Sequence, residues 1–325
     1  MDVSIIIVNY YSADLVVECI RSIFQKTENV IYEIIVVDNA SKDDSVKKIN
    51  HAYGNKITLI VSEENLGFGK ANNLGAKYAK GKYLFLLNPD TILENNAIKV
   101  LYDYLEQSPK VGIAGGNLYM PEMTAAPSYC LHFDTVDQEK KNASWIYLIK
   151  KKFQDKLALQ GKVRPFETTF NYSNEVKEVA YIFGADIMVS KSLFDAIKGF
   201  DPDFFMYAEE EELSWRVSQQ GLKIVNVPQA KIIHLEGATS KERNDFSEKQ
   251  FQMRMQGALT YYRKCYGTEG VEQFYKYRMR RYSRLLLFAK LRGKDTNDML
   301  PQVQLKCLEE CYLRMLEEKK EIGTP

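Results

Sequence analysis

Residues 3–10 read VSIIIVNY, a strand-forming stretch that decides the fold. Its first six residues are almost all apolar and β-branched, which is typical of a strand buried on both faces in a parallel sheet. The runs IIVV at 34–37 and YLFLL at 83–87 have the same character. We therefore expect them to lie in one sheet, with polar residues where each strand ends.

Helical spacing separates these strands. Leu15, Val16, Cys19, Ile20 and Ile23 recur at helical intervals after Ser12, a candidate helix cap. Further helices are expected over 68–79 and 93–105, and further strands over 57–61 and 111–114. This alternation predicts an α/β fold with a mostly parallel sheet flanked by helices.

The pattern changes after residue 116. Residues 117–178 lack clean periodicity and read as a long insertion over the carboxyl ends of the strands, where α/β proteins bind ligands. Regular structure is expected again over 179–189, with a helix at 210–219. Short strands are expected at 222–227 and 231–234, and from about residue 246 the pattern is helical.

Composition excludes several classes of protein. The 325 residues contain 44 Lys+Arg and 43 Asp+Glu, a net charge of +1 that argues against a uniformly basic nucleic-acid binder. Apolar residues make up 45% of the chain, too many for wholesale disorder. The five cysteines form no CxxC pair, which favours free thiols in a reducing cytosol. We expect no signal peptide and no membrane-spanning helix.

Polar residues follow the first two strands. Asn9 and Tyr10 come after the first, and Asp38 and Ser41 after the second. At adjacent parallel strand ends they would face a ligand crevice, where a carboxylate can accept hydrogen bonds from a base N–H or a ribose hydroxyl. The alternative is that Asp38 and Ser41 only cap a helix.

Residues 64–75, ENLGFGKANNLG, join the third strand to a helix. Gly67 and Gly69 allow a ligand to approach the backbone, and Lys70 adds a charge at the helix start. The stretch is neither a P-loop nor a GxGxxG motif, so phosphate binding from these glycines alone is weakly indicated. A tight turn is the alternative.

Asn88-Pro89-Asp90 follows the buried strand YLFLL directly. One carboxylate there can hold Mg²⁺ or Mn²⁺ together with a nucleotide diphosphate, although Asn-Pro-Asp also suits a simple turn. His234 ends the strand KIIH and would be a second ligand only if it met Asp90 across the sheet. A structural histidine is the alternative.

Four glutamates at 209–212 open the helix expected near 210–219. Glu209 and Glu212 would share a face, while Glu210 points elsewhere. Crowding of like charges would raise one pKa towards that of a general base. The alternative is a solvated helix start stabilised by the helix dipole.

The motifs as a set resemble the family 2 glycosyltransferases with the GT-A fold, especially their bacterial rhamnosyltransferase-like branch. The resemblance rests on VSIIIVNY, IIVVDNASKDDS, ENLGFGKANNLGAK, YLFLLNPDTIL, GADIMVSKSLFDAIKGFDPDFFMYAEEEELSWR and KIIHLEG. It covers about residues 3–240, with 117–178 poorly matched. It implies a catalytic domain at 1–240, with 117–178 as a variable insertion, and a helical C-terminal extension at 241–325.

The resemblance also implies roles for individual residues. Asp90 and His234 would hold Mg²⁺ or Mn²⁺. The nucleotide-sugar would be bound by Asn9, Tyr10, Asp38, Asn65, Phe68, Gly69, Asn73 and Asn88. Relatives carry Glu-Asp where this chain has Glu209-Glu210, so Glu210 is the expected catalytic base and Glu209 the alternative. Asp186 stands where relatives have a small or apolar residue, which would bear on acceptor choice.

The implied reaction is an inverting transfer. Glu210 would deprotonate an acceptor hydroxyl, which attacks the anomeric carbon of the donor from the face opposite the leaving diphosphate. dTDP-rhamnose or a UDP-hexose is the expected donor, and the acceptor would be a saccharide of a capsule, O-antigen or cell-wall polysaccharide.

Residues 273–294 contain eight Lys or Arg, no acid, and interleaved aromatic residues. Such a helix suits an anionic membrane surface, and hence a lipid-linked acceptor at the cytoplasmic face of the plasma membrane. Packing against the catalytic domain, or against a second copy in a homodimer, is the alternative.

Two other functions remain open on the sequence. A sugar-phosphate nucleotidyltransferase normally has a glycine-rich basic loop after its first strand, and Asn9-Tyr10-Tyr11 is not such a loop. A non-catalytic sugar-binding protein would not need the set Asp90, Glu210 and His234. No nucleic-acid partner is expected.

Overall fold

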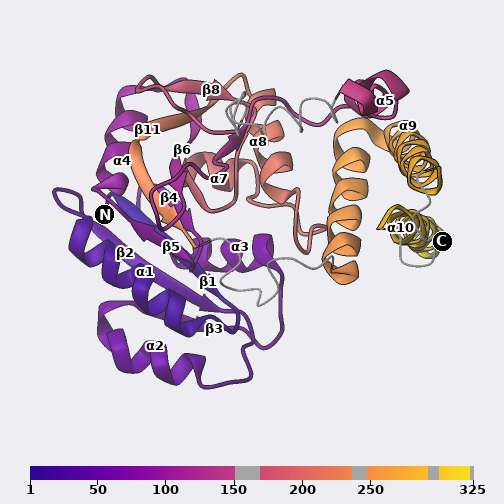
Figure 1. The fold of residues 1–325 in the computed structure, drawn as a ribbon. Helices are drawn as coiled ribbons and strands as arrows, with labels where there is room; N and C mark the ends of the chain where they lie inside the picture. The colour runs from indigo at the N-terminus through magenta and orange to yellow at the C-terminus, as the bar shows by residue number, and fades with distance from the viewer. Residues whose placement is uncertain (151–168, 236–246, 292–299, 323–325) are drawn as a thin grey trace. The chain divides into compact units, whose positions relative to one another are not determined.

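The computed structural model describes residues 1–150, 169–235, 247–291 and 300–322, and side chains as far as residue 317 (Figure 1). The chain divides into two compact units. The first comprises Met1–Phe133, Phe166–Phe205 and Glu209–Arg243, and the second Asp134–Pro165, Met206–Ala208 and Asn244–Pro325. Among the described residues, none of the helices has the length and hydropathy that a membrane span requires.

The first unit is built on a nine-stranded sheet in the order β3-β2-β1-β4-β10-β6-β11-β5, with β8 paired to β11. Its strands are β1 (Val3–Asn9), β2 (Tyr32–Asp38), β3 (Thr58–Val61), β4 (Tyr83–Leu87), β5 (Thr91–Leu93), β6 (Val111–Tyr119), β8 (Lys177–Val179), β10 (Asp186–Ser190) and β11 (Lys223–His234). Six run parallel, while β5, β8 and β10 are antiparallel to their neighbours. The predicted mostly parallel sheet is confirmed. A smaller sheet pairs β7 (Tyr129–Cys130) with β9 (Tyr181–Ile182).

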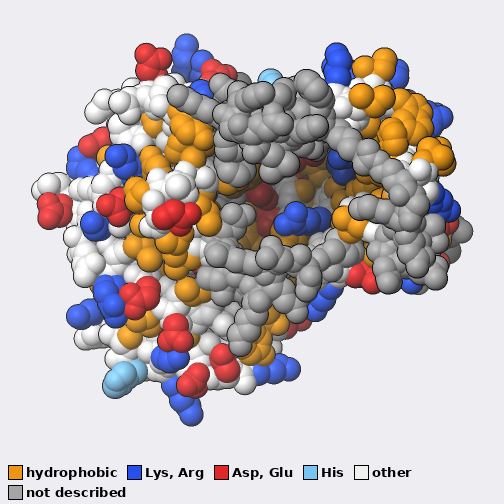
Figure 2. Space-filling model, viewed as in Figure 1, with side chains coloured by type: hydrophobic (Ala, Val, Ile, Leu, Met, Phe, Trp, Pro, Cys, Tyr) orange, Lys and Arg blue, Asp and Glu red, His pale blue; other side chains and the backbone are white. Residues whose placement is uncertain are grey.

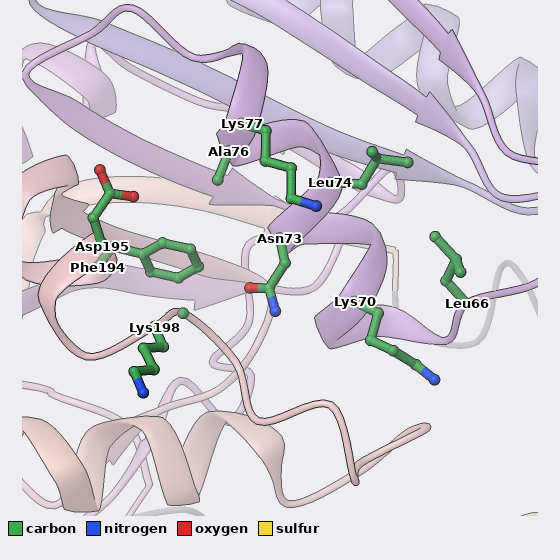
Figure 3. A pocket seen from close by; sticks show the side chains of 10 residues that line it. Leu66, Lys70, Asn73, Leu74, Ala76, Lys77, Phe194, Asp195 and Lys198 are labelled. Carbon is green, nitrogen blue, oxygen red and sulfur yellow. The ribbon is translucent and has the colours of Figure 1, made fainter.

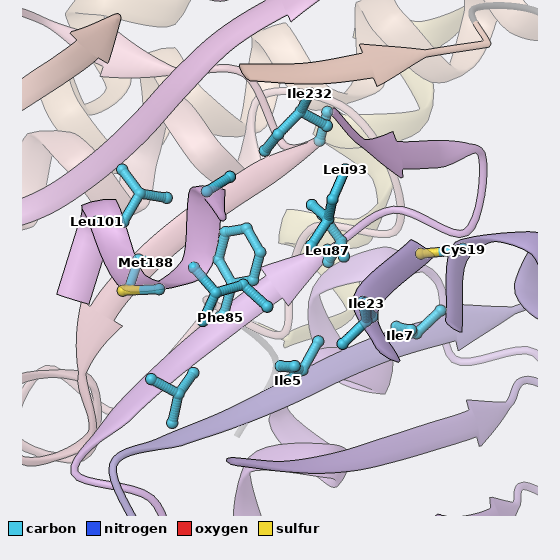
Figure 4. Packing of buried hydrophobic residues seen from close by; sticks show 14 of the residues in the cluster. Ile5, Ile7, Cys19, Ile23, Phe85, Leu87, Leu93, Leu101, Met188 and Ile232 are labelled. Carbon is cyan, nitrogen blue, oxygen red and sulfur yellow. The ribbon is translucent and has the colours of Figure 1, made fainter. Parts of the chain in front are cut away.

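Alternating side chains of β1 enter two separate cores. Ile5 and Ile7 pack with α1 (Ala13–Lys26), α2 (Ser45–Tyr53) and α4 (Ala97–Gln107) on one face of the sheet (Figure 4). Ile6 packs on the other face with α3 (Phe68–Tyr78), α7 (Lys191–Ala196) and α8 (Glu209–Gln219). Successive strand residues point to opposite faces, so helices on both sides explain why β1 is apolar throughout.

Two elements differ from their predicted form. The helix expected over 93–105 begins at Ala97, because residues 91–93 form β5 and pair with β11. The two strands expected at 222–227 and 231–234 are one strand, β11, whose register with β6 shifts between Asn226 and Lys231. Pro228 lies inside this irregularity, where its missing N–H is tolerated.

The second unit contains α5 (Val136–Asn142), α9 (Glu248–Lys290) and α10 (Leu300–Ile322). Gly267, at φ 68°, interrupts α9. The rings of Tyr275 on α9 and Tyr312 on α10 stack with centroids 4.0 Å apart. The predicted helical C-terminal region is confirmed, whereas the domain boundary at residue 240 stays a prediction. Part of the expected insertion 117–178, residues 151–168, lies outside the described residues.

Candidate functional site

The carboxyl ends of β1 and β2 hold a buried hydrogen-bonded pair. The parallel register places Asn9 beside Asp38, and Asn9 Nδ2 donates to Asp38 Oδ1 over 2.6 Å. The other oxygen, Oδ2, accepts from the backbone N–H of Ser41 at 3.1 Å. Both side chains are enclosed, so Asp38 is oriented by its neighbours. Ser41 therefore belongs to the turn after β2 and does not cap the next helix, because α2 begins only at Ser45.

Two tyrosines stand exposed beside this pair. Tyr10 is 46% exposed and Tyr11 50%, and their rings meet edge to face at 4.7 Å. Tyr11 (φ 52°) and Ala40 (φ 64°) both have left-handed backbone conformations that residues other than glycine rarely adopt. Such strained positions persist where the surroundings hold them, often at functional sites. Because Tyr10 is nearly half exposed, its ring is available to a ligand.

Asn39, which the sequence analysis did not single out, ties the β2 turn to the loop before α3. Its Nδ2 donates to Asn65 Oδ1 (2.9 Å), and its Oδ1 accepts from the backbone N–H of Leu66 (2.8 Å). Asn65 Oδ1 also accepts from the N–H of Gly67. The amide of Asn65 is therefore engaged in shaping its own loop. The only sequence signal for Asn39 was its place between Asp38 and Ser41.

Three predicted nucleotide-binding residues gather around Phe200. The ring of Phe68 lies 5.7 Å from that of Phe200, and a Cβ added to Gly69 would meet Phe200 Cβ at 2.8 Å. Asn73 pairs with the Phe200 backbone in both directions, at 2.8 and 2.9 Å. These contacts give all three residues a packing role, and their role in binding nucleotide stays a prediction.

A cavity of about 470 Å³ lies beside α3 and α7 (Figure 3). Its lining residues are Leu66, Lys70, Asn73, Leu74, Ala76, Lys77, Phe194, Asp195, Lys198 and Gly199. Of the predicted site residues only Asn73 reaches it. This cavity is therefore separate from the residues at the strand ends.

The structure brings Asp90 and His234 together. His234 is paired with Thr91 between β11 and β5, and its Nε2 lies 3.3 Å from Asp90 Oδ1. The backbone N–H of Leu235 also donates to the carbonyl of Asp90 at 2.8 Å. The Thr91 hydroxyl donates to the carbonyl of Asn88, which braces the 88–91 turn.

One carboxylate and one imidazole suit a divalent ion that shares its coordination with a substrate. Mg²⁺ and related ions are commonly held by one or two protein groups, with substrate phosphates and water completing the shell. Asp90 is buried and His234 is half-buried. Within the described residues no three or more His, Cys, Asp or Glu are grouped for metal binding. The donors therefore fit a phosphate-completed site and do not form an all-protein cage.

The four glutamates of α8 have different surroundings. Glu212 accepts two hydrogen bonds from Arg216, both at 2.7 Å, and Arg216 also donates to the carbonyls of Ile197 and Gly199. Glu209 and Glu211 are buried, while Glu210 is half-buried. Glu212 therefore has a structural role, because it holds Arg216 in place against the turn at residues 197–199.

Glu210 is linked to the Asn88 turn. Its carboxylate accepts from the N–H of Gly184, and the next carbonyl, that of Ala185, accepts from the N–H of Asn88 at 2.9 Å. Burial raises the pKa of Glu210, while the Gly184 N–H partly opposes that rise. Burial and the adjacent charge of Glu210 raise the pKa of Glu209 well above its usual range. Of the two residues, Glu210 has more exposed surface, and a general base must be within reach of its substrate.

Asp186 is enclosed at the start of β10. Its Oδ2 accepts from the N–H of Gly116 at 2.5 Å, and within the described residues Oδ1 has no hydrogen-bond partner. Burial raises the pKa of this carboxyl well above its usual range. Any influence on acceptor choice would therefore act through the packing of β10.

Comparison with known proteins supplies the family. The model of glycosyl transferase family 2 matches residues 4–172. The chain is 28% identical over 247 residues to the low-salt glycan biosynthesis hexosyltransferase Agl10 of Haloferax volcanii, covering 72% of this chain and 67% of that protein. It is 27% identical over 267 residues to the rhamnosyltransferase WbbL of Escherichia coli, covering 80% and 92%.

A further relative is the N-acetylglucosaminyl-diphospho-decaprenol L-rhamnosyltransferase of Mycobacterium tuberculosis, 25% identical over 215 residues, with 62% of this chain and 66% of that protein covered. Some relatives are much longer than the match. The chain spans only 18% of the O-antigen biosynthesis protein RfbC of Myxococcus xanthus.

Solved structures share the fold. GalNAc-T7, in a complex with UDP, GalNAc and Mn²⁺, matches with a TM-score of 0.59 at 14% identity, over 100% of this chain and 58% of that chain. The mannosyltransferase PcManGT from Pyrobaculum calidifontis, in a complex with GDP-Man and Mn²⁺, matches with a TM-score of 0.56 at 14% identity, over 98% and 87%. At this identity they show the fold alone, and the predicted GT-A fold is confirmed. Because the family model also matches more than half of the sequence, the chain belongs to glycosyl transferase family 2.

Proposed function

We propose that this protein transfers a sugar from a nucleotide-sugar donor to a saccharide acceptor at the strand ends that carry Asn9, Asp38 and Asp90, with Glu210 supplied by the start of α8. The observation that carries the proposal is the 3.3 Å approach of His234 Nε2 to Asp90 Oδ1. It provides two metal-binding groups where a donor diphosphate would need them. Family membership supports sugar transfer over the alternatives of a nucleotidyltransferase and a non-catalytic sugar-binding protein.

Donor binding is assigned to the predicted residues Asn9, Tyr10, Asp38, Asn65 and Asn88. The exposed Tyr10 ring offers an apolar face to a base or sugar. Asp38 is enclosed, so its proposed contact with the base or ribose requires the Ala40–Ser41 turn to move. Ala40, at φ 64°, already has a strained conformation in that turn. Phe68, Gly69 and Asn73 would support this site through the packing of α3.

Asp90 and His234 would hold Mg²⁺ or Mn²⁺, which when bound supplies positive charge to a departing nucleoside diphosphate. Glu210 takes the proton of the acceptor hydroxyl. The acceptor oxygen forms a bond to the anomeric carbon as the bond to the diphosphate oxygen breaks, and one such displacement inverts the anomeric configuration. A raised pKa suits Glu210 to this task near neutral pH, because a general base works best with a pKa near the operating pH.

The donor and acceptor are proposed from the relatives. Two relatives are rhamnosyltransferases and one is a hexosyltransferase, which supports dTDP-rhamnose or a UDP-hexose as donor. The Mycobacterium tuberculosis relative is named for a diphospho-decaprenol, which supports a lipid-linked acceptor in cell-surface polysaccharide synthesis. Work at the cytoplasmic face of the plasma membrane and a homodimer remain predictions.

A panel of UDP-, dTDP- and GDP-sugars tests the proposed function. Purified protein with Mn²⁺ should release the nucleoside diphosphate from one class of donor, faster when a suitable acceptor is present. No release from any donor would contradict sugar transfer. Pyrophosphate release from a sugar phosphate and a nucleoside triphosphate would instead indicate a nucleotidyltransferase.

A further inference from the structure

Large apolar side chains lie exposed on two segments of the second unit. Ile146 and Ile149, in the helical turn 145–150, are 70% and 59% exposed. Leu287 and Leu291, at the end of α9, are 46% and 75% exposed. Burying such side chains removes apolar surface from water, so a group of them on one surface indicates a binding partner.

These segments form one surface. The ring of Trp145 meets the ring of Phe288 edge to face at 4.8 Å. The guanidinium of Arg284 lies 5.3 Å from the centre of the Trp145 ring and donates to the carbonyl of Ala143. The turn 145–150 is thereby fixed against the last turns of α9. We call the surface formed by 145–150 and 287–291 the apolar patch.

Exposed basic side chains lie on the segments that carry the apolar patch and on the helices that lead to it. In Figure 2 hydrophobic and basic side chains gather over α5 and α9. The exposed bases of these segments are Lys140, Lys141, Lys150, Lys276, Arg280 and Lys290. On α9, Lys276, Arg280, Leu287 and Lys290 recur at helical spacing and so share one face. This face continues from basic to apolar along the helix.

The described residues of the patch carry no acidic side chain, and Asp155, Asp295 and Asp298, which follow it in the sequence, lie outside the described residues. Neither 140–150 nor 273–291 contains Asp or Glu. Glu139 is buried and paired with Arg278 at 2.6 Å. On α10, Glu309 lies near Tyr275, twelve residues before Leu287 and so about 18 Å away along α9. The exposed Asp137 stands at the start of α5.

We propose that the apolar patch docks on an anionic lipid bilayer. The isoleucines and leucines would enter the boundary between headgroups and acyl chains, while the exposed lysines of the same segments contact lipid phosphates. A second copy of the chain is a poorer occupant, because a symmetric dimer would set the same basic surface against itself. The patch lies wholly within the second unit, so this inference does not depend on the proposed sugar transfer.

Trp145 provides a direct readout, since the protein has two tryptophans. In the Trp215→Phe variant the remaining tryptophan is Trp145. Its emission should shift to the blue when vesicles of phosphatidylcholine and phosphatidylglycerol are added. Phosphatidylcholine alone should have little effect. In the converse variant, Trp145→Phe, Trp215 should report no shift. No shift of Trp145 at low salt would overturn the proposal.

Co-sedimentation with the same vesicles tests the two kinds of contact. Lys150→Glu with Lys290→Glu should weaken binding about 25-fold or more, since each basic residue near the surface contributes about fivefold. Ile146→Asp with Leu291→Asp should weaken it at least as much. The matched controls are Lys249→Glu and Leu313→Asp, two exposed residues of the same unit outside the patch, which should bind like the unaltered protein.

The side chains substituted for the co-sedimentation test are all exposed, and circular dichroism checks that each variant is folded. Vesicle binding that survives both double substitutions would overturn the proposal. So would patch variants that change the oligomeric state in solution and leave vesicle binding intact, which would identify the patch as a subunit interface. Nucleoside diphosphate release from a water-soluble donor should be unchanged in the patch variants, which separates this surface from the transfer site.

Discussion

His234 Nε2 lies 3.3 Å from Asp90 Oδ1 although the two residues are 144 positions apart in the chain. The pairing of β5 with β11 creates this contact, because it sets His234 opposite Thr91, the residue after Asp90. β5 has only three residues and leads directly out of the Asn88–Asp90 turn. A short antiparallel strand thus positions both proposed metal-binding groups.

Substitution of either group should weaken the response to metal. We expect Asp90→Asn and His234→Gln each to lower Mn²⁺-dependent nucleoside diphosphate release by at least about 10–100-fold, the range found when only a group that orients a metal ligand is lost. Both variants should need more Mn²⁺ for half-maximal activity. Glu94→Gln, an exposed carboxylate four residues along, is the matched control. Activity that chelator leaves unaltered would speak against a metal at Asp90.

Asn73→Ala should destabilise the fold. The change removes both hydrogen bonds to the buried Phe200 backbone and leaves its N–H and carbonyl unpaired, at a cost of about 1–3 kcal/mol for each group. Thermal unfolding measures the loss, and Lys77→Ala, one turn along α3 and exposed, should show none. A higher donor KM with unchanged thermal stability would instead favour direct nucleotide contact.

Asp186→Asn should change how stability depends on pH. Burial raises the pKa of Asp186 well above 3.8, so the folded protein keeps a proton that the unfolded chain releases above about pH 4. The free energy of unfolding of the unaltered protein is therefore lowered as pH rises beyond that value. The amide of the variant does not titrate and can still accept from the N–H of Gly116. The free energy of unfolding of the variant, relative to that of the unaltered protein, should therefore be larger at pH 8 than at pH 4. Equal differences at both pH values would contradict the buried, protonated state.

Much of the first unit could be predicted because its strands are buried on both faces. The unbroken apolar runs of β1, β2 and β4 have no other stable environment, and the polar residues after them mark the strand ends. From the sequence we could say only that His234 would be a metal ligand if it lay next to Asp90. That they do lie together could not be predicted, because β5 is too short to leave a periodic signal and its pairing with β11 is long-range.

Other features depended on packing that local patterns do not encode. The sequence predicted two short strands at 222–227 and 231–234, yet the chain continues through both as β11, with a register shift that contains Pro228. In the sequence, Gly69 and Asn73 were assigned to a nucleotide-binding motif. The structure shows that the same two residues allow α3 to pack closely on Phe200, a role that the motif does not reveal. The basic stretch at 273–294 showed no acid, but only the structure places Arg278 on the buried Glu139 and the apolar patch beside the remaining bases. Residues 292–294 of that stretch lie outside the described residues.

The pH dependence of turnover should follow Glu210. Its pKa is raised above 4.5 by burial, and a general base acts only when ionised. The rate kcat/KM should therefore rise with pH through a limb centred above pH 4.5. The Glu210→Gln variant should lose that limb in its residual activity. A limb retained at the same pH would assign it to another group.

The most direct measurement compares Glu210→Gln with Glu209→Gln in donor turnover and donor binding. Glu210→Gln should lower kcat by about 10²–10⁴-fold, the usual contribution of a general base, while the affinity for the nucleoside diphosphate stays the same. Glu209 has a pKa raised well above its usual range, so its neutral analogue should keep most of the activity. Turnover by Glu210→Gln equal to that of the unaltered protein would contradict the account.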